Sequence, residues 1–170
     1  MYLEKINGVF HPITENEIRN KHNRTSFPKN YDFTKIGFFE SVVTNVGYLP
    51  KNFIKRNNDG ELYNFYLDKP NNEGFFDVDE DSERDFLIKR LNDEISNLLN
   101  KTSREFGYDS IVSVRSYVGF ENEYQEECIK LANWSVECWK KSVFLIETIK
   151  KEDISNISIN NLINEIPRYK

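Results

Sequence analysis

The chain has 170 residues, which is enough for one domain or for two small ones with a sizeable hydrophobic core. Aromatic residues make up 14% of it, and their large rings can fill that core although only 38% of the residues are hydrophobic. The formal net charge of −5 disfavours general binding to nucleic acid, because such binding needs a basic face that neutralises phosphates.

Cys128 and Cys138 are the only cysteines, and both fall on one predicted helix. At a rise of about 1.5 Å per residue they lie about 15 Å apart, too far for a disulfide. We expect both to be reduced and buried, as in a protein made in the cytoplasm. No apolar run reaches the length of a membrane span, and the first residues lack the layout of a signal peptide, so we expect a non-secreted chain without a membrane segment.

Residues 1–12 are predicted to form a β-hairpin, because Asn7-Gly8 lies between apolar residues and favours a two-residue turn. A short helix should begin at Thr14, where Thr14 and Glu17 can form a capping box. A brief helical turn is expected within 31–39.

Two strand-like segments are predicted at 41–49 and 61–67, because both are rich in β-branched and aromatic residues. The Asn57–Gly60 turn separates them. The polar stretch 69–74 then reads as a linker.

The domain boundary is placed at the end of this linker. The prediction is an α+β protein, with a small N-terminal β-containing α/β docking domain at 1–74 and a C-terminal helical hairpin or bundle at 75–170.

The first long helix is predicted over 82–106, with Ser82 as its N-cap. Its apolar residues recur at spacings of three and four, which is typical of one buried face. These residues are Ile88, Leu91, Ile95 and Leu98, widened by Leu87 and Leu99.

Gly107 and Gly119 are predicted to end helices in the left-handed conformation, which glycine adopts at little cost. Asp109 would cap a short connecting helix at 110–118. A second long helix is predicted over about 122–150, and its small residues permit close approach of a neighbouring helix. Those small residues are Cys128, Ala132, Ser135, Cys138 and Ser142.

A final short helix is predicted at 160–166, capped by Ser158 and stopped by Pro167. The economical arrangement of the C-terminal half is an antiparallel helical hairpin that the short helix closes.

Three groups of residues were weighed as sites of chemistry. The acidic run 77–85 lacks the glycine and terminal glutamate of a calcium loop, so it fits a solvated helix start better. His11 and His22 match no metal-ligand spacing. Cys128 lies on an apolar stripe, which favours core packing over a nucleophile. We therefore assign no catalytic, metal-binding or cofactor-binding residue, and expect neither an enzyme nor a cofactor.

The N-terminal half carries more aromatic residues than a small sheet buries easily. One interpretation is an aromatic core, and the other is that several line a protein–protein interface. The residues concerned are Phe27, Tyr31, Phe33, Phe38, Phe39, Tyr48, Phe53, Tyr63, Phe65, Tyr66, Phe75 and Phe76.

Several separate markers lie in the C-terminal half. They are Gly107-Tyr108-Asp109-Ser110-Ile111, Ser116-Tyr117, Ala132-Asn133-Trp134, Trp139 and the ending Ser158…Leu162-Ile163-Asn164-Glu165-Ile166-Pro167. In this order they resemble a family of tailed-bacteriophage proteins, whose helical C-terminal domain reads approximately G-Y-D-S-I…S-Y…A…W-R-x-x-V-W and closes with T-x-x-E-L-I-x-E-L-P. The chain departs from that pattern at Ser135, where the family usually has Arg, and at Arg115, where it is usually small or apolar. It also departs at Cys138-Trp139, which replaces the common pair of an apolar residue and Trp. The stretches 18–28 and 47–50 resemble the openings of phage tail-associated proteins.

The resemblance implies a tail or tail-fibre context and supplies no catalytic residues. We expect a structural phage protein, an adaptor at the tail, baseplate or tail fibre. It would be made in the host cytoplasm and reside in the virion tail. Its partners would be other phage tail, baseplate or fibre proteins, with several copies per tail. Nucleic acid, membrane and small-molecule substrates are not expected as partners.

Two alternatives stay open. One is a tail-fibre assembly chaperone that leaves before the virion is complete. The other is a small enzyme acting on a cell-surface polymer, which would need a pair of carboxylates in a cleft.

Overall fold

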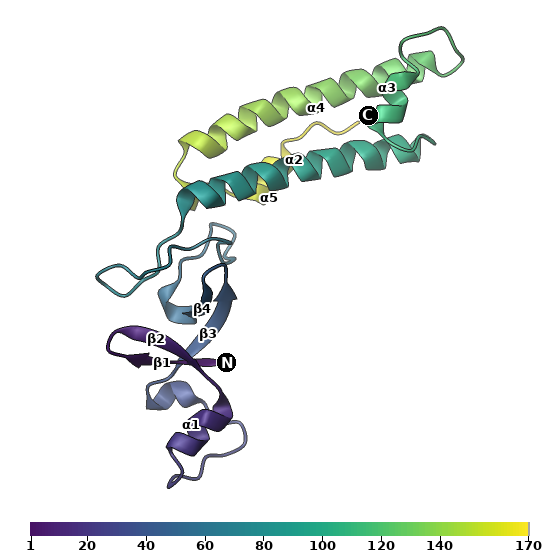
Figure 1. Ribbon diagram of the computed structural model, residues 1–170. Coiled ribbons are helices and arrows are strands. Elements are labelled where there is room, and N and C mark those ends of the chain that lie inside the picture. Colours follow the sequence, from purple (N-terminus) through teal and green to yellow (C-terminus); the bar gives the residue numbers. More distant parts are fainter. Residues whose placement is uncertain (170) are drawn as a thin grey trace. The chain divides into compact units, whose positions relative to one another are not determined.

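A four-stranded antiparallel sheet followed by helices makes up the computed structural model, which describes residues 1–169 (Figure 1). This confirms the predicted α+β class. By their contacts the residues divide into two units. The first unit is Met1–Arg56 with Gly60–Glu83, and the second is Asn57–Asp59 with the chain from Arg84 onward. The predicted linker 69–74 lies inside the first unit.

The sheet of the first unit has the strand order β2-β1-β3-β4. Its strands are β1 (Tyr2–Ile6), β2 (Val9–Ile13), β3 (Phe39–Thr44) and β4 (Gly47–Pro50). The predicted hairpin is confirmed, since β1 pairs with β2 around Asn7 and Gly8, whose φ values are 51° and 85°. Two successive positive φ angles define the tight turn that matches the natural twist of a hairpin.

Both edge strands of this sheet carry a proline, Pro12 in β2 and Pro50 in β4. Proline lacks the N–H group that a further strand would need. The edges are therefore blunted against pairing with another chain.

The predicted strand at 41–49 is in fact two strands, β3 and β4, with a turn at Asn45-Val46. The prediction of a strand at 61–67 is wrong, because this stretch forms only isolated bridges. The Asn45 side chain replaces a strand partner there. It accepts the Tyr66 N–H at 2.9 Å and donates to the Tyr66 carbonyl at 3.3 Å. A side-chain contact between distant residues is invisible to a local strand pattern.

One face of the sheet is covered by α1 (Glu15–Lys21) and the 3-10 turn η1 (Phe33–Ile36). The capping box of Thr14 and Glu17 is present, as predicted. Gly37 ends the turn with φ 96°. Beneath these elements lies a core cluster of Ile13, Ile18, Phe33 and Phe38, flanked by Tyr2, Phe27 and Tyr31.

A second aromatic cluster lies around Phe10. Its ring centroid is 5.3 Å from that of Phe39, 5.8 Å from that of Phe53 and 6.3 Å from that of Phe76. The register places Phe10 opposite Lys5 and Phe39 opposite Leu3, so both rings belong to the face away from Tyr2 and Ile13. Aromatic residues thus fill both faces of the sheet.

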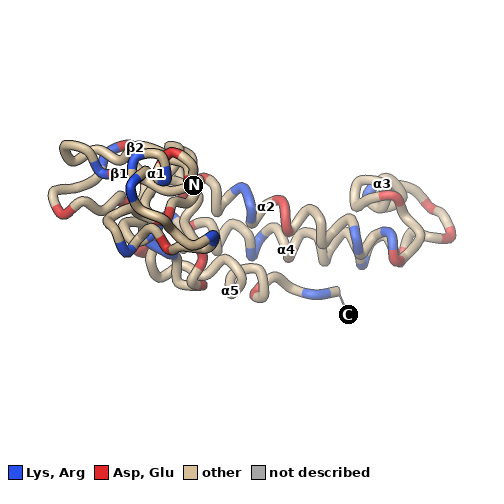
Figure 2. Tube along the Cα trace, turned by 90° about the horizontal axis from the view of Figure 1, so that it is seen from below, with Lys and Arg blue, Asp and Glu red and all other residues tan. Residues whose placement is uncertain are grey.

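The second unit is a helical hairpin with an added C-terminal segment (Figure 1). Its elements are α2 (Glu80–Glu105, whose first turn belongs to the first unit), α3 (Ile111–Ser116), α4 (Gln125–Lys151), the 3-10 turn η3 (Ile154–Asn156) and α5 (Ile159–Asn164). Helices α2 and α4 lie side by side and antiparallel, as predicted, and α3 closes one end. Lys, Arg, Asp and Glu are distributed along both long helices (Figure 2).

The deepest row of α2 has a spacing of four: Leu87, Leu91, Ile95, Leu99 and Ser103 are all buried. The facing row of α4 has alternating spacings of three and four, and we call it the core row. It consists of Cys128, Leu131, Ser135, Cys138, Ser142, Leu145 and Ile149, all buried. Its small members allow polar contact between the helices, since the Ser142 hydroxyl lies 3.2 Å from the amide oxygen of Asn92.

The helix caps correct two predictions. Helix α2 is capped by Asp79 instead of Ser82, because the Asp79 carboxylate accepts the Ser82 N–H at 3.2 Å. Helix α3 is capped by Ser110 instead of Asp109, with the Ser113 N–H at 3.3 Å. In both cases the cap lies next to or near the predicted one, and only backbone geometry distinguishes them.

Gly107 and Gly119 differ in backbone conformation. Gly107 has φ 88° and ends α2, as predicted, with the Tyr108 N–H donating to the Ser103 carbonyl at 3.0 Å. Gly119 has no positive φ, so the prediction of a left-handed stop there is wrong. Helix α3 has already ended at Tyr117 in a right-handed conformation.

The C-terminal segment packs against α4. Ser158 caps α5, as predicted, by accepting the Asn161 N–H at 3.3 Å. The Trp134 indole N–H donates to the Pro167 carbonyl at 3.0 Å, and the Lys141 ammonium pairs with Glu165 at 2.7 Å. One side of α4 is therefore covered by this segment.

Replacing Gly107 by Ala should destabilise the protein by about 1 kcal/mol, because a side chain disfavours the left-handed conformation. No atom lies within 4 Å of the added Cβ, so the cost is conformational and not steric. The matched control is Gly119→Ala, which should change stability by less than about 0.5 kcal/mol. Urea denaturation measures both, and equal effects would contradict the assignment.

Candidate interaction surfaces

The acidic run 77–85 has structural partners. Lys55 lies 2.9 Å from the Asp77 carboxylate, and this hydrogen bond holds the pKa of Asp77 below its ordinary value. Asp79 caps α2. In residues 1–169 no group of three or more His, Cys, Asp or Glu side chains is arranged to hold a metal ion.

Glu83 is the buried carboxyl of the run, with 2% of its surface exposed. Its side chain accepts the Asn64 N–H at 2.9 Å. Burial raises the pKa of Glu83, and the hydrogen bonds from Asn64 oppose that shift in part. The contact anchors the irregular 61–67 stretch to the first turn of α2, which is a structural role.

The histidines do not converge. Both His11 and His22 are exposed, and the ring of His22 lies edge-on to Phe27 and Phe38 at centroid distances of 6.0 and 6.1 Å. His22 therefore lies against the margin of the first aromatic cluster.

Both cysteines are buried and free, as predicted. Burial raises the pKa of Cys138 to about 11, so this thiol is protonated at neutral pH. The Tyr108 hydroxyl donates to Glu127 at 2.8 Å, and its pKa is raised, chiefly by a hydrogen bond with Cys128 and then by burial. Tyr108 and Cys128 thus form part of the packing where the hairpin closes.

An open cleft of about 900 Å³ lies at that closed end of the hairpin. Phe106 and Tyr169 line it, their ring centroids 5.2 Å apart. Its charged residues carry both signs: Glu105, Glu123, Glu126 and Glu127 with Lys101, Lys130 and Arg168. Within the described chain no buried side-chain nitrogen or oxygen lacks a hydrogen-bond partner, so the cleft holds no buried unpaired polar group.

The aromatic residues of the N-terminal half mostly form a core. Of the twelve weighed, five are buried, five are half-buried, and only Tyr48 and Phe75 are exposed, at 40% and 38%. Tyr48 pairs across the strands with Val43, which is 72% exposed. The interface interpretation is thus reduced to a small patch on β3 and β4.

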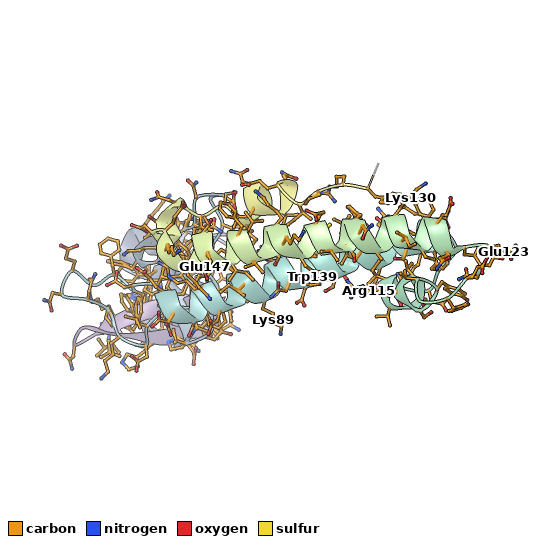
Figure 3. All side chains as sticks on the ribbon, turned by 90° about the horizontal axis from the view of Figure 1, so that it is seen from above. Lys89, Arg115, Glu123, Lys130, Trp139 and Glu147 are labelled. Atoms are coloured by element: carbon orange, nitrogen blue, oxygen red, sulfur yellow. The ribbon has the colours of Figure 1, made fainter. Side chains whose placement is uncertain are left out.

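A partly exposed apolar row lies on α4, next to the core row. We call it the outer row. It consists of Ile129, Ala132, Val136, Trp139, Val143 and Ile146, at alternating spacings of three and four. Val143 is 64% and Val136 44% exposed, while Trp139 is half-buried. Trp139, labelled in Figure 3, lies about 160° around the helix from Lys141, which pairs with the C-terminal segment.

The two rows together span about 200° of the circumference of α4, at 100° per residue. A helix that packs on one side needs an apolar arc of roughly 100°. The sequence analysis predicted this helix without separating an outer row from the core row. The outer row could have been recognised in the sequence, because its heptad pattern is offset by one residue from that of the core row.

Comparisons with protein-family models, with curated proteins and with solved structures each found no match. Among the helices in residues 1–169, none combines the length and the apolar character needed to cross a bilayer.

The Glu83→Gln variant should gain stability over the wild-type protein as the pH rises from about 4 to 7. A raised pKa in the folded state means that the wild-type protein is most stable below the ordinary glutamate pKa of 4.5 and loses this contribution as Glu83 ionises. Glutamine keeps an acceptor for the Asn64 N–H but cannot ionise. Denaturation in urea across this pH range measures the difference.

The matched control is Glu147→Gln, for which the opposite sign is expected. Hydrogen bonds from Lys151 and Lys150 lower the pKa of Glu147, so its contribution is present above pH 4.5 and lost in acid. This exposed variant should lose stability relative to the wild-type protein as the pH rises. A Glu83→Gln curve parallel to that of the wild-type protein would contradict the role assigned to burial.

Proposed function

We propose that this protein is a structural component of a bacteriophage tail, an adaptor at the tail, baseplate or tail fibre that acts through protein–protein interfaces. The observation that carries the proposal is the outer row of α4. An apolar row without charge, about 25 Å long on a regular helix, is a typical helix-packing surface.

The resemblance to the phage family supports this proposal, since its markers have defined places in the second unit. Gly107 ends α2, and Ser110 caps α3. Trp134 and Pro167, thirty-three residues apart, are joined by a hydrogen bond. Markers that are distant in sequence thus stabilise one helical unit, as expected of a motif that specifies a fold.

The ionisable groups also favour binding over catalysis. Those with a shifted pKa have structural partners: Asp77 pairs with Lys55, and Glu83 accepts the Asn64 N–H. The Tyr66 hydroxyl donates to the Lys55 carbonyl at 2.5 Å, and burial raises the pKa of Tyr66 to about 12. The partners we propose are other tail, baseplate or fibre proteins.

The second candidate function is that of a tail-fibre assembly chaperone. It is favoured by the exposure of the outer row in the isolated chain, because a surface that is open before assembly can hold an incomplete fibre subunit. The two candidates differ in whether the protein stays in the particle.

Mass spectrometry of purified particles of the encoding phage tests the proposal. A structural adaptor should be present at a fixed copy number that matches a tail symmetry. The control is a phage-encoded replication protein, which should be absent from the same preparation.

Absence of the chain from particles, despite abundance in infected cells, would contradict the adaptor. The chaperone would then be tested by co-expression with the fibre protein. It should raise the yield of soluble fibre trimer and be missing from the purified fibre.

A further inference from the structure

The outer row of α4 is complementary to itself when two copies run in opposite directions. In heptad terms Ile129, Val136 and Val143 occupy one position, and Ala132, Trp139 and Ile146 occupy the other. A single two-fold axis near residues 137–138 faces every member of the first set with a member of the second.

Two of the three facing pairs set a larger side chain against a smaller one. Ile129 faces Ile146 of the second copy, and Val136 faces its Trp139. Val143, the most exposed member of the row, faces the small Ala132 of the second copy. A large side chain opposite a small one is how adjacent layers interdigitate in packed helices.

The charges beside the row allow two copies to approach. No charged residue lies within the row itself. On α4 the flanking charges Lys140 and Glu147 are already paired within the helix: Lys140 lies 2.9 Å from Glu137, and Glu147 lies 3.3 Å from Lys151. From α3, Arg115 lies beside the row and donates to the Ser135 hydroxyl at 2.9 Å. These charges keep their partners when two copies pair, whereas a charge buried without a partner would be costly.

The size of the row sets the strength of the contact. A row about 25 Å long, on a helix pair about 10 Å wide, buries roughly 500–600 Å² in total. A stable interface buries about 1,200–2,000 Å², so this one belongs to the weak and reversible class.

We propose that this protein forms a reversible two-fold homodimer, in which the outer rows of two α4 helices pack antiparallel. Phe144 lies about 100° away from Val143 around the helix and outside the row, where the Lys141 ammonium sits 5.0 Å from its ring centroid. The inference does not rest on the proposed function, because it concerns the isolated chain.

Sedimentation of the full chain over a concentration series from about 5 to 500 μM tests the dimer, a range suited to a contact of this size. The wild-type protein should shift from monomer towards dimer. Val143→Glu should remain monomeric, because a carboxylate within the row would be buried unpaired against Ala132 of the second copy. Since Val143 is 64% exposed, this variant keeps the fold of the single chain, which circular dichroism verifies.

Phe144→Glu is the matched control. This neighbour is 63% exposed, so the same charge is added at the same exposure on the same turn. It should dimerise like the wild-type protein. A wild-type chain that stays monomeric throughout, or equal loss of the dimer in both variants, would overturn the proposal.

Disulfide trapping tests the direction of packing. Chains with Ile129→Cys should cross-link to chains with Ile146→Cys, whereas either variant alone should not, because its own positions lie about 25 Å apart across the antiparallel pair. The native Cys128 and Cys138 are buried and leave the background low. Cross-linking of Ile129→Cys to itself would indicate parallel packing and overturn the proposal.

The test of the dimer and the mass spectrometry of particles can fail independently of each other. Loss of the dimer leaves the particle analysis unaffected, and absence from particles leaves the solution dimer unaffected. A different result is a wild-type chain that is monomeric and binds a tail protein, with binding abolished by Val143→Glu and retained in Phe144→Glu. That result would overturn the homodimer and support the adaptor.

Discussion

The second unit depends on the packing of the core row of α4 against the buried row of α2. Small residues in the core row, such as Ser135, Cys138 and Ser142, leave room for neighbouring side chains, and Asn92 of α2 contacts Ser142 through one of these gaps. The short helix α3 contributes to the same packing, since Arg115 donates to the Ser135 hydroxyl at 2.9 Å. Two of the three places where the chain departs from the phage family pattern, Arg115 and Ser135, thus contact each other.

The C-terminal segment covers a second side of α4 through Trp134 and Lys141, and the outer row occupies a third. The apolar arc of α4 is about twice the arc that a helix packed on one side needs. Exposed apolar area of this kind is costly in water, and it is typical of surfaces that pack against another protein. In the first unit the aromatic residues fill the two faces of a small sheet, the edge strands carry prolines, and Val43 and Tyr48 form a small exposed patch.

Local signals of the fold could be predicted from the sequence. The Asn7-Gly8 hairpin, the Thr14 capping box and the Gly107 stop each depend on a few adjacent residues, and each is confirmed. The strand at 61–67 was wrong, because the Asn45 side chain and Glu83 hold that stretch through contacts that no local pattern reveals. The N-caps were displaced by up to three residues, because several polar residues near each helix start have similar propensity.

The candidate surface was harder to predict than the fold. A run of apolar residues on α4 was evident, but the sequence does not say which of them face α2. Only the structure separates Cys138, which is buried, from Trp139, which lies on the next side of the helix and is half-buried. The exposure of Val136 and Val143 follows from that geometry.

The central claim is that the outer row of α4 is covered in the working protein, and Trp139 reports on it directly. A Trp134→Phe variant leaves Trp139 as the single tryptophan. Its fluorescence should shift to shorter wavelength and become protected from acrylamide quenching as the protein concentration rises. An emission maximum and a quenching constant that do not change with concentration, or on addition of the tail proteins, would contradict the account.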